Sequence, residues 1–546
     1  MVVALGAVSA IGGPEGCAAG PEESVREAAQ AVDEAQAVAA DPGDTVVSKD
    51  IGIDPIGIDP IGIDPIGIDP ILCTDAPACD GTITANVDPS LVVPRPTHAA
   101  LLDTHFQLAD VLQQLITLSG AAGETPTELL RRLWDTENDA GSAAFNDGFQ
   151  PHCAGSLNNY PLECNRGEGG LAFSVEPTDF IPVALFNRFD LAPADGSHCG
   201  EYRIVYSSTA VTGALIFEGQ LPNPNPACGL EACRPVAEFW QSLSSVSNPA
   251  TLGKLLREFY FGGLPGFSPV IQPENYGFSA GKGVYGASGG QIRSNTITTS
   301  WQLREFHLAL GDAASGATLF AEPVTVKNNP FGELFEFGSS RPEAPSFQSF
   351  FPDSSSGTSE VQTLVATNVN RVSMATPDNF NAGQSTVSFD VINDYQTALD
   401  AGGPGNPFMN AIGAELQRIF CAPGTVCTPP LTAQNVADRA TSQSCAGCHQ
   451  LSNGVNMGNG MTWPSSNGFL HVGFSGNLSP ALRCVFLPHR QSVLLTFLRN
   501  CPTTKVPVVT PLGCGSSGGG KGGGIPVEPV LESTEPETLG GGSKVN

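Results

Sequence analysis

The sequence predicts an α+β fold: a β-rich, antiparallel body with inserted helices, followed by a smaller all-α unit near the C-terminal end. Three observations lead to this prediction. Short segments rich in β-branched and aromatic residues, separated by Gly, Pro and Asn, dominate residues 170–400. Apolar residues return to helical spacing from residue 407 onward. The 63 glycines and 45 prolines among 546 residues favour many turns over long helices.

The β-rich body is assigned to residues 81–406. Its first part, 99–133, shows the apolar spacing of helices, and further helices are expected around 236–260. Strands are expected in short runs of apolar and β-branched residues, bounded by turn residues. These runs are 180–186, 202–207, 214–217, 324–326 and 385–391.

The all-α unit is assigned to residues 407–512. Phe408, Ile412 and Leu416 form one apolar stripe of its first helix, and a second helix is expected from residue 432 toward residue 444. Another helix is expected to begin at Ser479-Pro480, and a last one to follow the interruption at Pro488.

Three further segments complete the predicted organisation. Residues 1–22 resemble a signal or lipoprotein segment, because a short apolar run precedes Cys17. Residues 23–80 are an acidic spacer that leads into four copies of Gly-Ile-Asp-Pro-Ile, where proline at every fifth position forbids a regular helix and favours an extended linker. Residues 513–546 form a Gly-rich, acidic tail that is expected to be disordered.

The chemical centre of the sequence is Cys445-Ala-Gly-Cys448-His449, a C-x-x-C-H motif. Two thiols three positions apart are about one helical turn apart, so both can form thioethers with the vinyl groups of one haem. His449 would then be the proximal iron ligand. Three different interpretations remain open: a redox dithiol, a zinc site completed by Cys421 and Cys427, and a plain disulfide.

The motif is preceded by a helix and followed by a Gly-rich loop and C-terminal helices, and this arrangement resembles a small c-type cytochrome domain. The resemblance covers residues 407–505. It implies an all-α, cytochrome c-like domain that holds one haem c through Cys445 and Cys448, with His449 on the iron. The rest of the chain resembles no family of known function.

The sixth iron ligand is less closely defined by the sequence. His471 lies among Phe469, Leu470, Val472 and Phe474 and is the expected distal ligand. Met461 could take that position instead. Met457, His489 and an open sixth position are further alternatives.

The net charge and the cysteine count limit partners and location. A net charge of -29 repels phosphate backbones, so nucleic acid is not an expected partner. Fifteen cysteines favour an oxidising compartment: the periplasm, the outer membrane surface or the extracellular space. Without Cys17 and the motif pair, twelve cysteines remain and permit six disulfides. No apolar run is long enough to span a bilayer, so membrane attachment is expected only through a lipid on Cys17.

Polar side chains are unusually dense in four stretches of the β-rich body, 187–190, 198–203, 290–295 and 301–305. They could form buried ion-pair networks that organise the fold. They could instead line a site for a substrate or for haem propionates, because a guanidinium fork matches a carboxylate. The residues concerned are Arg188, Arg203, Arg293 and Arg304 with Asp190, Glu201 and Glu305.

The function expected from these features is single-electron transfer by an exported c-type haem protein that meets redox partner proteins. A second hypothesis is a haem-dependent enzyme of the peroxidase or oxygenase type with a displaceable sixth ligand. The common di-haem peroxidase arrangement would need a second C-x-x-C-H motif, which the sequence lacks. A third hypothesis is a surface scaffold or adhesion protein in which the haem is structural.

Overall fold

The computed structural model describes most of the chain between residues 87 and 499. The described ranges are 87–121, 123–136, 153–164, 172, 174–210, 212–278, 289–297, 301–313, 316–355, 357–387 and 393–499. The predicted segments 1–22, 23–80 and 513–546, including Cys17 and the five-residue repeat, lie outside the described residues.

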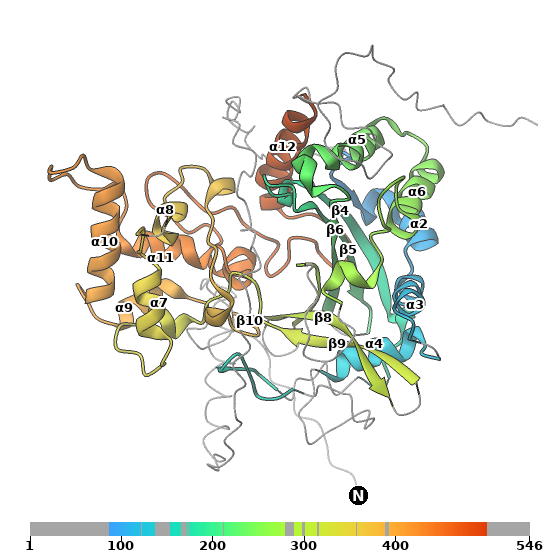
Figure 1. Cartoon of the computed structure of the whole chain (residues 1–546), viewed down its shortest axis with the longest axis horizontal. Helices are drawn as coiled ribbons and strands as arrows, with labels where there is room; N and C mark the ends of the chain where they lie inside the picture. Colours follow the sequence, from blue (N-terminus) through green and yellow to red (C-terminus); the bar gives the residue numbers. More distant parts are fainter. Residues whose placement is uncertain are drawn as a thin grey trace, which may run out of the picture.

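An antiparallel sheet of eight strands forms the centre of the molecule, in the order β1-β4-β5-β6-β7-β8-β10, with β9 also paired to β8 (Figure 1). The predicted strands 180–186, 202–207 and 214–217 fall within β4, β5 and β6. The α+β class is therefore confirmed. The strands are β1 Val92–Pro94, β4 Phe180–Arg188, β5 His198–Ser208, β6 Gly213–Pro222, β7 Gln291–Ile297, β8 Trp301–Ala313, β9 Gly316–Val324 and β10 Ser385–Thr386, with a separate small pair β2 Ser156–Leu157 and β3 Tyr160–Pro161.

One face of the sheet packs against a layer of helices. Every second residue of a strand points to the same face, and on β5 these residues are Tyr202, Ile204 and Tyr206, all fully buried. Tyr206 donates a hydrogen bond to the carbonyl of Phe106 at 2.9 Å, and the Tyr202 ring stacks on Trp240 with 5.7 Å between centroids. The helices of this layer are α2 Arg95–His105, α3 Leu108–Ser119, α4 Pro126–Asp135, α5 Arg234–Ser242 and α6 Pro249–Arg257.

The opposite face of the sheet is charged. Arg203 lies between Tyr202 and Ile204 in sequence and therefore points away from the helices, opposite Glu218 of β6. On β7, Arg293 lies opposite Glu305 of β8. Alternation along the strands thus gives the sheet one apolar face and one face that carries charged residues among apolar ones.

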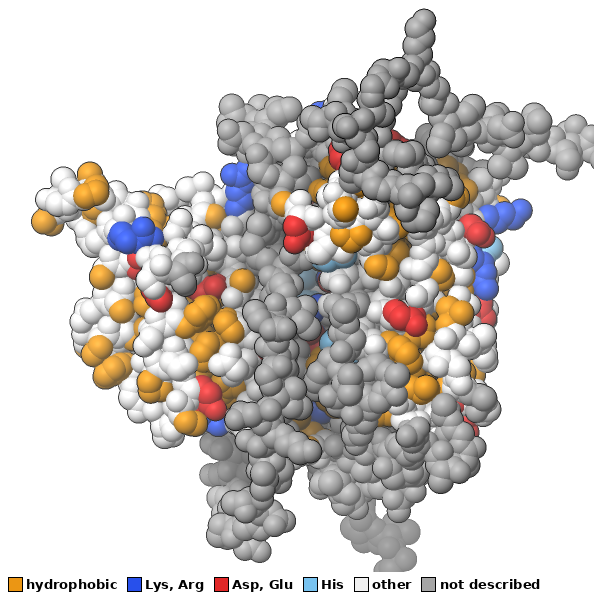
Figure 2. All heavy atoms as spheres, viewed as in Figure 1, with side chains coloured by type: hydrophobic (Ala, Val, Ile, Leu, Met, Phe, Trp, Pro, Cys, Tyr) orange, Lys and Arg blue, Asp and Glu red, His pale blue; other side chains and the backbone are white. Residues whose placement is uncertain are grey.

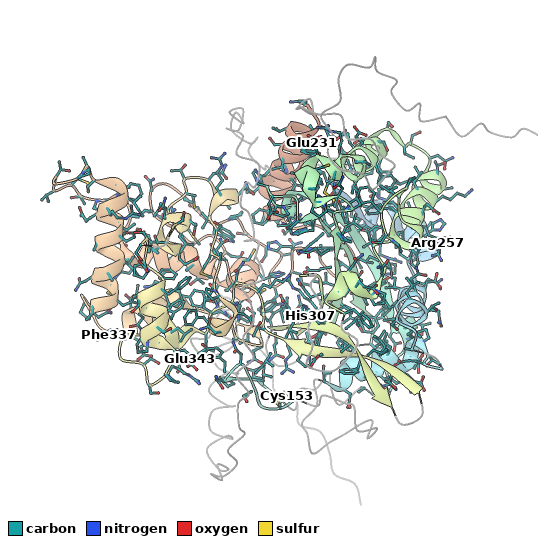
Figure 3. The ribbon with its side chains drawn as sticks, viewed as in Figure 1. Cys153, Glu231, Arg257, His307, Phe337 and Glu343 are labelled. Atoms are coloured by element: carbon teal, nitrogen blue, oxygen red, sulfur yellow. A yellow bond between two sulfur atoms is a disulfide. The ribbon has the colours of Figure 1, made fainter. Side chains whose placement is uncertain are left out.

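A second, helical unit lies on the far side of the sheet from α2–α6 (Figure 1). Its apolar core is built from stacked aromatic rings, such as Phe335 on Tyr395 at 4.4 Å between centroids. Figure 3 shows Phe337 and Glu343 on this unit and Arg257 on the opposite side of the sheet. The helices are α7 Ala344–Phe350, α8 Glu360–Leu364, α9 Tyr395–Ala401, α10 Pro407–Phe420 and α11 Ala433–Thr441.

The helical core begins well before residue 406, where the sequence predicts the end of the β-rich body. Residues from Phe331 onward belong to it, and so does Tyr160. Of the strand predicted over 385–391, two residues form β10, and 388–391 lie outside the described residues. The predicted helices after 407 and 432 match α10 and α11.

The last helix, α12 Leu487–Arg499, packs against the core of the sheet rather than against the helical unit. Phe497 of α12 meets Phe189 at 4.9 Å between ring centroids, and the Arg234 guanidinium lies 4.8 Å from the centre of the Phe497 ring. Residues 407–499 therefore do not share one core. No helix in the described part of the chain has both the length and the apolar character needed to cross a bilayer.

Disulfides account for eight of the ten described cysteines. Cys153 pairs with Cys164 and Cys421 with Cys427, whereas Cys233 pairs with the distant Cys199 rather than with nearby Cys228. Cys445 and Cys448 are the two described cysteines that are free.

Candidate functional site

The C-x-x-C-H motif follows α11 after a short turn at 442–444 and leads into a π-helical turn, Gly447–Leu451. Thr432 caps the start of α11 by accepting a hydrogen bond from the backbone of Asn435. At the other end, a Cβ atom on Gly447 would lie 1.7 Å from the carbonyl oxygen of Thr441. Only glycine fits between the two cysteines at this position, because any side chain would overlap the backbone of the preceding helix.

The two motif cysteines are buried thiols. Cys445 is 5% exposed and Cys448 is half-buried. Burial raises the pKa of each thiol to about 12, so both stay protonated at neutral pH. A reactive redox dithiol instead needs a lowered cysteine pKa, which disfavours the redox dithiol as an interpretation of this pair.

His449 is oriented by the loop that follows it. Its Nδ1 lies 2.8 Å from the carbonyl oxygen of Phe469. A carbonyl can only accept, so Nδ1 carries the proton and donates, and Nε2 keeps the lone pair that a metal would need. Burial lowers the pKa of His449 to about 4, which keeps the imidazole neutral at neutral pH. The Trp301 ring at the start of β8 stacks on the imidazole, with 5.2 Å between centroids.

The structure brings His471 to the motif. The rings of His449 and His471 lie 4.8 Å apart, and Nε2 of His471 is 3.3 Å from the sulfur of Cys448. Nδ1 of His471 lies 2.9 Å from the hydroxyl oxygen of Ser479. Burial, with a contribution from His449, holds the pKa of His471 well below its usual range. Both imidazoles are therefore neutral at neutral pH and lie beside the motif.

The spacing of the two imidazoles limits how a metal could lie between them. Metal–imidazole bonds are about 2 Å long, and each nitrogen lies about 1 Å from its ring centre, so two axial imidazoles would have centroids about 6 Å apart. The observed separation is 4.8 Å. His471 would have to shift by roughly an ångström to become the second ligand.

The remaining candidate sixth ligands are placed differently. Met457 and Met461 lie in the aromatic core of the helical unit, where the Met457 amide bonds to the Met461 carbonyl at 2.8 Å. Neither methionine lines the cavity beside the motif. His489, in the first turn of α12, does line it. Of the candidate sixth ligands, His471 and His489 thus line the cavity, whereas Met457 and Met461 do not.

The cavity lies between the charged face of the sheet and the motif. The space between its walls, open solvent included, is about 1330 Å³, and the centres of water-sized spheres can occupy about 190 Å³ of it. Figure 2 shows histidine atoms at the hollow between the two halves of the molecule. The apolar lining comes from the sheet, from residues 369–372 and from the segment after the motif, and it includes Phe186, Val205, Ile216, Leu303, Val369, Val372, Trp463, Leu470, Leu482 and Phe486.

The charged wall contains most of the polar residues singled out in the sequence. Arg188, Arg203 and Arg293 line the cavity together with Asp190. Arg304, which the sequence groups with them, does not belong to this wall: it points to the other face of β8, where it donates to the carbonyl oxygens of Thr136 and Glu163. The reason is the strand alternation, since residue 304 lies between 303 and 305.

Sequence reasoning missed two residues of the charged wall, Glu218 and Arg490. Glu218 is fully buried on β6 and bonds to both Arg203 and Arg293 at 3.0 Å. Its alternation with Phe217 in the strand is a signal that could have found it. Arg490 reaches the cavity from α12, and nothing in its local sequence indicates that position.

Comparison of the chain with models of known protein families, with curated proteins and with solved structures finds no match. The chemistry of the site therefore has to be inferred from its own geometry.

The residues present fit a covalent haem better than they fit zinc. Cys421 and Cys427, which would have completed a four-sulfur zinc site, are bonded to each other. Across the described ranges, no three His, Cys, Asp or Glu side chains are grouped as metal ligands. Two free thiols, an imidazole with an available Nε2 and a large, partly apolar cavity are what a haem with two thioethers and an axial ligand requires.

Proposed function

We propose that the chain carries one haem c, attached to Cys445 and Cys448 and ligated by His449, and that it transfers single electrons. The observation that carries this proposal is the state of the two cysteines: they are free thiols facing a cavity, in a chain whose other eight described cysteines are disulfide-bonded. Their sulfur–hydrogen bonds can add across two vinyl groups, so that each sulfur gains a carbon and each hydrogen passes to the neighbouring carbon. No external oxidant or reductant is needed for that step.

The residues around the haem would fix its environment. The Phe469 carbonyl holds His449 in the tautomer that offers Nε2, and the stacked Trp301 ring limits the rotation of the imidazole. When bound, the haem supplies a one-electron iron couple. The Ser479 hydroxyl contacts Nδ1 of His471 and so leaves Nε2 of that ring facing the motif.

Electron transfer is favoured over peroxide or oxygen chemistry because His471 lies beside the proposed proximal ligand. If His471 ligated the iron, it would occupy the position that peroxide or oxygen needs. Whether His471 ligates the iron therefore also decides between electron transfer and the enzyme hypothesis. The haem domain we propose is cytochrome c-like in its motif, although its last helix packs on the sheet.

The location we propose is outside the cytoplasm: periplasmic, attached to the outer membrane, or extracellular. The eight disulfide-bonded cysteines support it, since disulfides persist in oxidising compartments. Redox partner proteins are the proposed partners.

The test is the spectrum of the full chain expressed with a c-type maturation system, beside Cys445→Ala/Cys448→Ala and His471→Ala variants. We expect a c-type pyridine haemochrome that acidified organic solvent does not extract, and we expect the double variant to lose it. The wild-type spectrum should be low-spin and should become high-spin in His471→Ala. Absence of covalent haem would refute the proposal, whereas a high-spin wild type that turns over peroxide would replace electron transfer with catalysis.

A further inference from the structure

Four buried arginines converge on the cavity that faces the C-x-x-C-H motif. Arg188, Arg203 and Arg293 come from three strands of the sheet, and Arg490 comes from α12. Their side chains are between 6% and 19% exposed. Burying guanidinium groups is costly unless each is matched by an anion. An arginine that lacks its own carboxylate partner in the protein would therefore favour binding of an anionic ligand in the cavity.

The carboxylates that line the cavity are too few for the arginines. Asp190 forms a bidentate pair with Arg188 at 2.9–3.2 Å and is the carboxylate that Arg490 reaches, at 3.7 Å. Glu218 is shared between Arg203 and Arg293. Four guanidinium groups thus line the cavity, whereas only two of the four carboxylates that pair with them are among its lining residues.

Two more carboxylates, Glu201 and Glu305, neutralise the network from behind the lining. Glu201 bonds to Arg203 at 2.7 Å, and Glu305 bonds to Arg293 at 2.7 Å. These two carboxylates hold the arginines in place, but it is the guanidinium groups that line the cavity. Nε of Arg203 is buried and has no hydrogen-bond partner in the described part of the chain.

Arg490 is the least compensated of the four. Its nearest carboxylate, Asp190, already makes closer bonds with Arg188. Burial, together with the charge of Arg188, lowers the pKa of Arg490 to about 9. An anion in the cavity would reverse that effect, because a nearby negative charge favours the protonated guanidinium.

We propose that Arg490, with Arg188 and Arg203, binds the two propionate carboxylates of the haem. This inference rests on the proposed function and deepens it, since it assigns the edge of the haem that is not tethered. Thioethers at Cys445 and Cys448 would fix the vinyl edge, and the guanidinium forks would take the carboxylates, as their bidentate geometry favours. The haem would then have one orientation in the cavity.

The test compares two porphyrins on the full chain produced without haem maturation: ferric protoporphyrin IX and its dimethyl ester, in which both carboxylates are masked. Quenching of tryptophan fluorescence reports binding, because Trp463 lines the cavity. We expect the free acid to bind at least about tenfold more tightly than the ester. Equal affinity for the two would overturn the propionate assignment.

Variants locate the effect. Arg490→Gln should weaken binding of the free acid by about tenfold and leave that of the ester unchanged, while Arg490→Lys should retain most of the affinity. Arg95→Gln, which removes a surface pair with Asp103, is the control and should change neither. If Arg490→Gln weakens both porphyrins equally, the arginine acts on the fold and the assignment is refuted.

Covalent attachment in the maturation host is measured in parallel, which separates the two proposals. Covalent haem with equal affinity for acid and ester would leave the proposed function intact and overturn this inference alone. Absence of covalent haem together with no binding of either porphyrin would overturn both.

Discussion

At the scale of single residues, the site depends on contacts made by backbone atoms as much as by side chains. The Phe469 carbonyl sets the tautomer of His449, and the Thr441 carbonyl leaves room for glycine alone at position 447. Both contacts tie the motif to residues outside it. The motif's chemistry therefore relies on a local backbone path that substitution can disturb without touching a thiol or an imidazole.

Gly447 provides the sharpest test of that dependence. We expect Gly447→Ala to destabilise the protein by about 3 kcal/mol and to lower the yield of covalent haem, because its Cβ would overlap the Thr441 carbonyl. The matched control is Gly413→Ala in α10, where a Cβ meets no atom within 4 Å. That change should stabilise by about 0.5–1 kcal/mol. Denaturant unfolding of both variants measures the difference, and equal effects would contradict the steric argument.

Single residues also show what could be predicted from the sequence. The motif residues Cys445, Cys448 and His449 could be singled out because their spacing is local. Arg490 could not, because its place in the wall depends on α12 packing against a sheet that lies far away in sequence. Arg304 fits the buried-network interpretation and not the shared site, because the two-residue period of the strand turns it to the other face, which polar density alone does not show.

At the scale of elements, α9 and α11 hold carboxylates close together. Asp438 on α11 is held partly buried near Asp394 and Asp400, and burial, followed by the charges of these neighbours, raises its pKa to about 6. Because the pKa of Asp438 is higher in the folded state than in the unfolded chain, its protonated carboxyl contributes to folding stability. That contribution is fully present below about pH 4 and is lost as the pH rises through 6.

Replacement of Asp438 by Asn should therefore stabilise the protein at pH 7.5. We expect a gain of about 1–2 kcal/mol after allowance for solvent screening. At pH 4 the wild-type carboxyl is mostly protonated in the folded state, and the gain should nearly vanish. Thermal unfolding at the two pH values checks this, and a gain of equal size at both would show that charge is not the cause.

Some of the helices and strands could be predicted from the sequence, and others could not. The central strands and α10 and α11 could be predicted because their apolar periods are long and regular. The helices between 344 and 364 could not, because α7 and α8 have seven and five residues and are too short to show a helical period. Their stability comes from the stacked aromatic core, which is a tertiary feature.

At the scale of the whole molecule, the cavity lies between two separate apolar cores. A small third cluster of Trp301, Leu303, Val326, Cys445 and Ala446 joins β8 directly to the motif. A haem held by thioethers in this cavity would contact the sheet, the helical unit and α12 together. The site therefore links parts of the chain that otherwise share few apolar contacts.

Haem loading should accordingly stabilise both cores. We expect the matured protein to unfold at a higher temperature than the Cys445→Ala/Cys448→Ala variant from the same host, by on the order of 5 °C. Hydrogen exchange should slow in β5 and in α11 alike. Protection confined to the segment around the motif would show that the haem does not join the two cores.

The order of the chain along the cavity has a consequence for biosynthesis. The sheet residues that line the cavity lie within 186–303, the motif comes later at 445–449, and Trp463, His471 and Arg490 come last. A chain emerging from a membrane pore with its N-terminus first would present the arginines of the sheet before the two motif thiols, then the thiols before His471, and Arg490 last. The site becomes complete only when the final helix has emerged. A truncated chain ending soon after residue 449 would therefore keep the attachment motif and lose the binding pocket.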